Sequence, residues 1–282
     1  MGSDENMSEK VDRRSALKTT GAAVAGIVIG AAAGWALKPV PPSPPKAKFA
    51  EAPPEGTEVT IVHGFDAAYP PFTEIDPTGK AVGFDVEVVN WIAEKYGWKV
   101  VPKPWDWAAI VTALVEGDLD IVMSGMSHTA ERAEKVWFTI PYYPYYHQLM
   151  ALATETRTMN ELLNSGEYIS CQLGATGDKW AEKLLAAGNN FKKLALDSYA
   201  LAFEAVKDGR AVAAISDSAF TGSYLEENPG IFKEVGKIGG IETYAAATRP
   251  GDYWLRNQVN YALEEIMASP LWDELKEKWK VL

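Results

Sequence analysis

Residues 120–132 combine the side chains that could hold a small carboxylate. An apolar strand pattern ends at Ser124 and Gly125, where a glycine lets the backbone approach a ligand closely. Thr129 stands where it can cap a short helical turn that carries Arg132. Hydroxyls, free backbone N–H groups and a fixed guanidinium together suit a carboxylate. The alternative is an ordinary strand–loop–helix junction whose arginine makes a surface ion pair.

The rest of the chain from residue 57 alternates between strand and helix patterns. The hydrophobic spacing predicts strands at 57–63, 98–101, 119–123, 147–154, 168–172, 191–194, 211–216 and 242–248, and helices at 84–96, 107–116, 178–187, 197–208, 218–228, 254–268 and 271–279. Such short alternating units indicate an α/β fold with mostly parallel sheets. Ligands of these sheets bind beyond the carboxyl ends of the strands, where the Ser124 loop, the Gly174 loop and Asp217 all fall.

Composition and charge narrow the function. The 282 residues allow two modest domains or one large one. The formal net charge is −11, and residues 1–50 carry +3 (seven Lys/Arg against four Asp/Glu), which leaves −14 for the remainder. That acidity disfavours nucleic acid or an anionic membrane surface as the partner of the folded part. One cysteine and three unpaired histidines give no metal-binding spacing, so we expect neither a metal nor a cofactor.

The N-terminus is typical of an export signal. Arg13 and Arg14 precede an apolar run from Gly21 to Leu37, which is the order of a twin-arginine signal peptide. The run could instead remain as a membrane anchor. We assign residues 1–38 to this signal or anchor and the proline-dense residues 39–56 to a linker. In both cases we expect the folded part to be periplasmic or extracellular.

Five motifs occur in one order along the chain: 66–72 (Asp-Ala-Ala-Tyr-Pro-Pro-Phe), Gly83-Phe84-Asp85, the 120–132 stretch, Gly174-Ala175-Thr176, and Gly209-Arg210 followed by Asp217. Together they resemble the polar amino-acid-binding proteins of ABC importers, family 3 of the extracellular solute-binding proteins. The resemblance covers about residues 57–280.

The resemblance implies a two-lobed clamp of the periplasmic-binding-protein type II, each lobe a mostly parallel mixed sheet flanked by helices. The first lobe would comprise 57–146 plus 245–282, and the second 151–240. Two crossover strands, near 146–151 and 243–247, would form the hinge. It also implies a monomer that passes an amino acid to a membrane permease.

The resemblance also implies roles for individual residues. Arg132 would grip the α-carboxylate of the ligand, together with the backbone N–H groups of Ser127 and Thr176. Asp217 would pair with the α-ammonium, helped by the Gly125 carbonyl and the Ser127 hydroxyl. The full set of expected ligand-binding residues is Asp66, Tyr69, Trp107, Ser124, Gly125, Ser127, Arg132, Gln172, Thr176 and Asp217.

The sequence says less about the side chain of the ligand than about its carboxylate and amino groups. Tyr69 and Trp107 would flank it, and Asp66 could meet a distal cation, which favours a basic or polar amino acid. Gly125 replaces a serine of some family members and so loses a hydroxyl.

Several alternatives stay open from the sequence. Asp217 could be the N-cap of the next helix, and Tyr69 and Trp107 could belong to the core of a lobe. Asp66 and Gln172 could equally be structural.

Two other functions compete with amino-acid transport. One is a dehydratase of prephenate-like acids on the same fold, for which the loop after Gly177 offers only Asp178 as a general acid. The other is a sensor module, which would need a partner receptor or an output domain on the chain.

Overall fold

The computed structural model describes residues 47–281. The predicted export signal and residues 39–46 of the predicted linker lie outside these residues. None of the helices within 47–281 is both long and apolar enough to cross a membrane.

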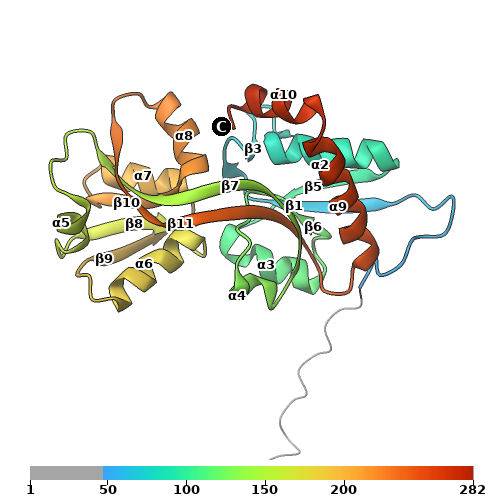
Figure 1. Ribbon diagram of the computed structural model, residues 1–282, viewed down its shortest axis with the longest axis horizontal. Helices are drawn as coiled ribbons and strands as arrows, with labels where there is room; N and C mark the ends of the chain where they lie inside the picture. Colours follow the sequence, from blue (N-terminus) through green and yellow to red (C-terminus); the bar gives the residue numbers. More distant parts are fainter. Residues whose placement is uncertain (1–46, 282) are drawn as a thin grey trace, which may run out of the picture. The chain divides into compact units, whose positions relative to one another are not determined.

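Two lobes share one eight-stranded sheet of order β5-β1-β6-β11-β7-β10-β8-β9. The first lobe contributes β5 (Lys99–Pro104), β1 (Thr60–Phe65) and β6 (Ile121–Val122); the second contributes β10 (Ala213–Asp217), β8 (Tyr168–Gln172) and β9 (Lys192–Leu196). The long antiparallel strands β7 (Trp137–Leu152) and β11 (Phe232–Thr248) pass from one lobe to the other (Figure 1). We call these two the crossover strands.

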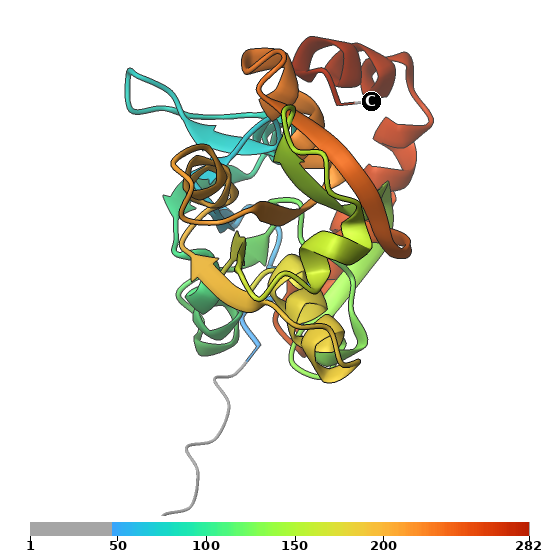
Figure 2. The same cartoon turned by 90° about the vertical axis from the view of Figure 1, so that its left-hand side faces the viewer.

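Helices cover both faces of each half of the sheet. The first lobe has α2 (Phe84–Tyr96), α3 (Trp107–Glu116), α4 (Ala130–Ala133), α9 (Tyr253–Met267) and α10 (Pro270–Trp279), with a small sheet of β2 (Ala68–Tyr69), β3 (Thr73–Ile75) and β4 (Ala81–Val82). The second lobe has α5 (Met159–Leu163), α6 (Thr176–Ala186), α7 (Tyr199–Lys207) and α8 (Ser218–Glu227). Figures 1 and 2 show α6 and α7 on opposite faces of the second lobe's strands.

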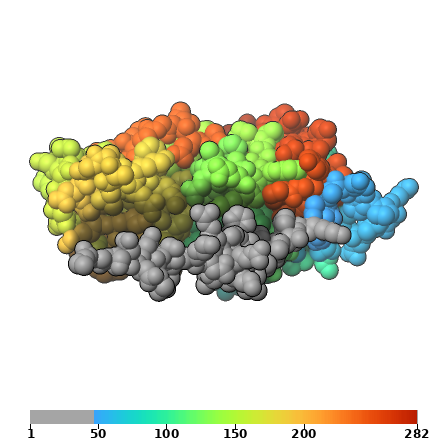
Figure 3. Space-filling model, turned by 90° about the horizontal axis from the view of Figure 1, so that it is seen from below, coloured from blue at the N-terminus to red at the C-terminus, as the bar shows by residue number. Residues whose placement is uncertain are grey.

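The lobes touch each other directly. Side chains of the second lobe (yellow) abut those of the first (green) on the face drawn in Figure 3. A Cβ on Gly174 would lie only 3.1 Å from the Cα of Ala108 in the opposite lobe. Lys179 of α6 also lies 3.9 Å from Glu131 of α4. Any solute between the lobes is therefore enclosed by both.

The predicted helices and strands agree with the structure to within a few residues except along the crossover strands, whereas the small sheet of β2, β3 and β4 and helix α5 were not predicted. Helices α2 and α3 and strand β8 have the predicted bounds, and left-handed Gly97 and Gly117 end the two helices. Strand β7, however, begins at Trp137 instead of residue 147. This added stretch contains Pro141 and Pro144, and along it the described partner of β7 is β11 alone, which is the kind of sheet edge where prolines are found. Strand β11 likewise begins ten residues earlier than predicted, at Phe232.

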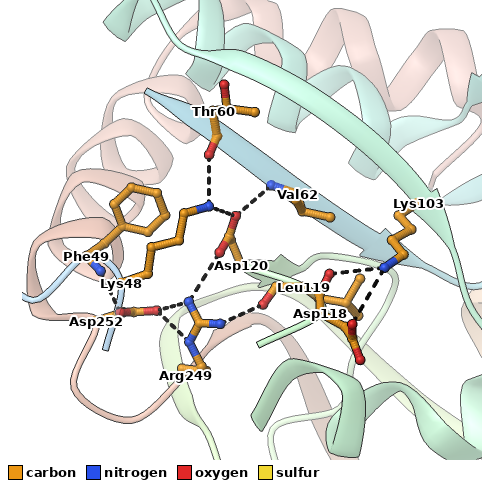
Figure 4. A network of polar contacts seen from close by, with 10 residues as sticks. All are labelled: Lys48, Phe49, Thr60, Val62, Lys103, Asp118, Leu119, Asp120, Arg249 and Asp252. Atoms are coloured by element: carbon orange, nitrogen blue, oxygen red, sulfur yellow. Dashed lines mark hydrogen bonds and ion pairs between the residues drawn. The ribbon is translucent and has the colours of Figure 1, made fainter. Parts of the chain in front are cut away.

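A buried network of charges joins β6 to the end of β11 (Figure 4). The guanidinium of Arg249 lies 3.2 Å from Asp120 and 3.1 Å from Asp252, and the three side chains are at most 4% exposed. The other oxygen of Asp120 accepts hydrogen bonds from the Val62 N–H at 2.9 Å and from Lys48 at 2.6 Å. The same carboxylate thus fixes the strand that leads into the Ser124 loop.

Part of the predicted linker belongs to the folded part. Phe49 is 5% exposed, and its ring lies 5.9 Å from that of Trp254. Its N–H donates to Asp252 at 2.8 Å. The chain is therefore attached to the first lobe from about this residue onward.

We expect Asp120→Ala to lower the free energy of unfolding by about 3–5 kcal/mol, because it leaves Arg249 buried with one partner fewer. Urea denaturation measures this change. Asp118→Ala is the control: that carboxylate is half exposed, lies 4.0 Å from Lys103 (Figure 4), and should change stability by no more than about 0.5 kcal/mol. Equal midpoints for the two variants would contradict a stabilising role for the network.

Candidate functional site

A small cavity of about 10 Å³, room for about one water molecule, lies between the lobes. An amino acid would need the lobes to be further apart to enter it. Nine of the ten residues expected from the sequence line it, and Arg132 is the exception. The lining residues are Asp66, Tyr69, Trp107, Ser124, Gly125, Ser127, Gln172, Ala175, Thr176, Tyr199 and Asp217.

Arg132 lies beside the cavity and connects the two lobes. The side chain of Thr129 caps α4 by accepting a hydrogen bond from the Arg132 N–H, as predicted. The guanidinium lies 5.2 Å from the ring centroid of Trp107 and donates to the carbonyls of Ser127 at 3.1 Å and Gly174 at 3.2 Å. Both acceptors are neutral. Within residues 47–281 no carboxylate lies within ion-pair distance of this guanidinium, which excludes the surface ion pair.

The cation and a helix N-terminus define an anion-binding end. Burial lowers the pKa of Arg132, although a guanidinium stays charged at any ordinary pH. Helix α6 begins at Thr176, and its first N–H groups have no partner within the helix. A ligand carboxylate between Arg132 and this helix terminus would receive charge-assisted hydrogen bonds from both lobes.

Asp217 is a buried acidic residue in the lining of the cavity. It is 4% exposed. One carboxylate oxygen accepts the Phe220 N–H at 2.8 Å and so caps α8, while the other accepts the Tyr69 hydroxyl at 2.8 Å. Burial raises the pKa of Asp217, and the hydrogen bonds from Phe220 and Tyr69 oppose that rise. The sequence left Asp217 open as either a helix N-cap or a ligand-binding residue. These two interpretations are compatible, since Asp217 caps α8 and also lines the cavity.

A second carboxylate, Asp66, bridges the lobes elsewhere in the cavity. It is 6% exposed and accepts hydrogen bonds from the Gln172 amide at 2.7 Å and the Ala68 N–H at 2.9 Å. Its own N–H donates to the Ser124 hydroxyl at 3.0 Å. Burial raises the pKa of Asp66, and the hydrogen bonds from Ala68 and Gln172 oppose that rise. The cavity thus presents two carboxyl groups to its contents.

Gly125 provides the space that Tyr69 occupies. Its φ is +55°, and its N–H donates to the buried Asp85 at 2.7 Å. A Cβ on this residue would lie 2.3 Å from Cε1 of Tyr69. The glycine therefore does more than omit a hydroxyl, because it lets an aromatic ring lie against the loop.

Two cavity residues, Ala175 and Tyr199, were not among those expected from the sequence, and Tyr199 is the larger. It is 2% exposed, and its ring lies 5.3 Å from Phe220 and 6.0 Å from Tyr69. It opens α7 directly after the N-cap Ser198. Tyr199 lies just beyond the carboxyl end of β9. The rule that ligands bind beyond the carboxyl ends of strands, which selected Asp217, could therefore have selected Tyr199 as well.

Comparison with known proteins places the chain among transport proteins. The family described as "Bacterial extracellular solute-binding proteins, family 3" matches residues 61–281. A "Probable histidine-binding protein" of Neisseria gonorrhoeae is 29% identical over 217 residues, which are 76% of this chain and 80% of the relative. The structure of an ancestral arginine-binding protein bound to arginine superimposes with a TM-score of 0.71 at 35% identity and covers 78% of this chain and 97% of that one. An ancestral amino-acid-binding protein described as a precursor of cyclohexadienyl dehydratase gives a TM-score of 0.71 at 33% identity, over 78% and 95% of the two chains.

We expect Gly125→Ala to destabilise the protein by about 1–2 kcal/mol from its left-handed backbone alone, and further because the Tyr69 ring must move. Gly222→Ala is the matched control, since Gly222 lies in α8 with no atom within 4 Å of its missing Cβ. That change should stabilise the protein by up to about 1 kcal/mol. Urea midpoints that move in the same direction for both variants would contradict this account of Gly125.

Proposed function

Because this chain belongs to family 3 of the bacterial extracellular solute-binding proteins, we propose that it binds one amino acid between its lobes and delivers it to the permease of an ABC importer. The observation that carries this proposal is the separation of charge across the cavity. Arg132, without a carboxylate partner in the described part of the chain, stands at one end, and the buried Asp217 stands at another. A zwitterion complements both.

We propose a basic amino acid as the ligand, with arginine as the first candidate. Asp66 provides a second negative charge at a distance from the α-ammonium site, next to Gln172. The rings of Trp107 and Tyr69 line the same cavity and can pack on a guanidinium or imidazole plane. The names of the relatives, which include histidine-binding and arginine-bound proteins, support this class.

The crossover strands would serve as the hinge between lobes of residues 57–146 plus 245–282 and 151–240. The β7–β11 register shifts between Ile238 and Ile241, where Gly239 has a φ of +70°. A glycine at such a shift can absorb the change in backbone angles that closure requires. The ligand would favour the closed form because it bonds to both lobes at once.

The setting of the chain follows from the same proposal. We propose that the folded part works as a monomer in the periplasm or outside the cell, delivered or tethered by residues 1–38. The twin-arginine pattern of Arg13 and Arg14 supports export.

We propose that the chain binds its ligand without chemical turnover. Asp178, which the sequence offered as a general acid, does not line the cavity and pairs with Lys193 at 2.6 Å. The two carboxyl groups that do line it, Asp66 and Asp217, each accept a backbone N–H and a side-chain hydrogen bond.

Incubation with prephenate and arogenate should give no aromatic product; turnover would establish the dehydratase alternative.

In a thermal-shift screen against the twenty amino acids, a basic one should raise the melting temperature most, because the ligand binds the folded state alone.

With that amino acid, Arg132→Ala should reduce affinity in calorimetry at least about 30-fold, since truncation of a buried charge that pairs with the ligand costs about 2 kcal/mol or more. Arg210→Ala is the control, because Arg210 is half exposed and pairs with Asp208 on the surface. Undiminished binding by Arg132→Ala would refute the carboxylate site.

Asp217→Asn should reduce affinity about tenfold or more while the melting temperature of the ligand-free protein stays close to wild type. Asparagine caps a helix as well as aspartate does, so the bond to Phe220 is kept, while the charge and the acceptor for the Tyr69 hydroxyl are lost. Asp217→Ala should additionally cost about 1 kcal/mol of stability from the lost cap. If Asp217→Asn bound the ligand as the wild type does, Asp217 would be a cap alone.

A further inference from the structure

A cluster of hydroxyl groups lies behind the cavity, where the two lobes meet the crossover strands. The Ser127 Oγ of the first lobe is 3.1 Å from the Thr176 Oγ1 of the second. The hydroxyl of Tyr145, on β7, is 2.7 Å from the Ser127 Oγ and 2.7 Å from an oxygen of Glu242, on β11. Tyr145 and Glu242 do not line the cavity, so they reach its contents only through Ser127 and Thr176.

The direction of these hydrogen bonds follows from the number of hydrogens. Tyr145 has one hydroxyl hydrogen and two oxygen neighbours at the same distance. The carboxylate of Glu242 has no hydrogen to give, so it must accept the one from Tyr145. Ser127 can then make its short contact with Tyr145 only by donating its own hydrogen. The contact of Ser127 Oγ with Thr176 Oγ1 at 3.1 Å then needs the hydrogen of Thr176, which leaves one lone pair of Ser127 as an acceptor.

Glu242 is ionised in this position. Burial by itself would raise the pKa of Glu242, but hydrogen bonds from His147, Trp180 and Tyr145 outweigh it and lower that pKa to about 2. The Trp180 indole N–H donates to the carboxylate at 2.9 Å, and His147 Nδ1 lies 3.5 Å from the same oxygen. Burial also raises the pKa of Tyr145, so that hydroxyl keeps its hydrogen.

The serine cannot easily turn away from this arrangement. The backbone on either side of Ser127 is paired with β11, through His128 N–H to the Thr243 carbonyl and Ala245 N–H to the Met126 carbonyl, both at 2.9 Å. An isolated bridge also joins Ser127 to Tyr244. Because Glu242 lies on β11 as well, the carboxylate and the serine are held by the same strand.

We propose that Glu242 and Tyr145 are positioning residues that direct the hydroxyl hydrogen of Ser127 away from the cavity, so that Ser127 Oγ accepts a hydrogen bond from the ligand's α-ammonium. This inference rests on the proposed function and specifies how the chain recognises the amino group. An ammonium has only hydrogens to give, so every neighbour must accept. Asp217 supplies the charge, and the oriented serine supplies a second acceptor.

The first test compares Tyr145→Phe and Glu242→Gln by calorimetry. The probes are L-arginine and 5-guanidinopentanoate, which has the same carboxylate and guanidinium but no amino group, measured by competition up to millimolar concentration. Both variants should lose about tenfold in affinity for L-arginine, as for one hydrogen bond to a charged group, and less than about twofold for the analogue. In Glu242→Gln, the new side-chain amide can donate a hydrogen bond to Tyr145. Tyr145 would then donate its own hydrogen to Ser127 and occupy the lone pair that the ligand's ammonium needs.

Tyr146→Phe is the matched control, because Tyr146 is the next residue on β7 and its hydroxyl contacts the exposed Glu234 at 3.3 Å. It should bind both probes as the wild type does. Equal losses for L-arginine and the analogue in Tyr145→Phe and Glu242→Gln would overturn the proposal, since they would indicate a general disturbance of the site.

A double-mutant cycle gives an independent test. In a Ser127→Ala background, Tyr145→Phe and Glu242→Gln should cause no further loss of L-arginine affinity, because their effect passes through the serine hydroxyl. Losses that simply add would overturn the proposal.

Absence of binding of any of the twenty amino acids to the wild-type protein would instead refute the proposed function, and the inference with it. If another amino acid binds, it and its deaminated analogue replace the arginine pair.

Discussion

The pairing of the crossover strands β7 and β11 is the constraint on which the structure depends. This one antiparallel ladder, from Trp137 with Thr248 to Leu152 with Phe232, joins two half-sheets whose other pairs are mostly parallel. Strand β6 pairs with β11 and leads into the Ser124 loop; strand β10 pairs with β7 and ends at Asp217. Both ends of the cavity are therefore positioned from the same ladder, although they belong to different lobes. A change in the twist of this ladder must alter the distance between them.

Buried charge explains why a ligand would hold the lobes together. Asp66 and Asp217 are both less than a tenth exposed, and burial raises the pKa of each carboxyl group because the charged form loses its hydration. Arg132 meets only carbonyl oxygens among the described residues. Each of these groups makes the closed arrangement costly until a group of opposite charge arrives. The proposed cationic amino acid would offer one such group to each of the three, which would couple binding to closure.

Local rules predicted most of the fold because most elements follow them. The helical spacing from 84 to 96 and from 107 to 116 and the cap at Thr129 appear as predicted. The family resemblance identified nine of the cavity residues, and the rule that ligands bind at the carboxyl ends of strands identified the Ser124 loop, the Gly174 loop and Asp217. The crossover strands were underestimated because prolines in β7 and glycines in β11 resemble breaks, and only the tertiary pairing shows that they lie along open edges. For the same reason, the sequence could not place Tyr145 and Glu242 together: they are 97 residues apart and meet through that pairing.

The loss of a hydroxyl at Gly125 can now be related to the rest of the site. The space beside Gly125 is filled by Tyr69, whose ring stacks on Phe220 at 5.9 Å and whose hydroxyl reaches Asp217. Tyr69 also bonds to the Tyr244 hydroxyl at 2.6 Å, and the ring of Tyr244 lies 4.2 Å from that of Tyr145. The glycine thus exchanges one small polar group for a tyrosine pair that links the first lobe to both crossover strands. With no hydroxyl at residue 125, the proposed orientation of the Ser127 hydroxyl by Tyr145 and Glu242 would provide a second acceptor for the amino group.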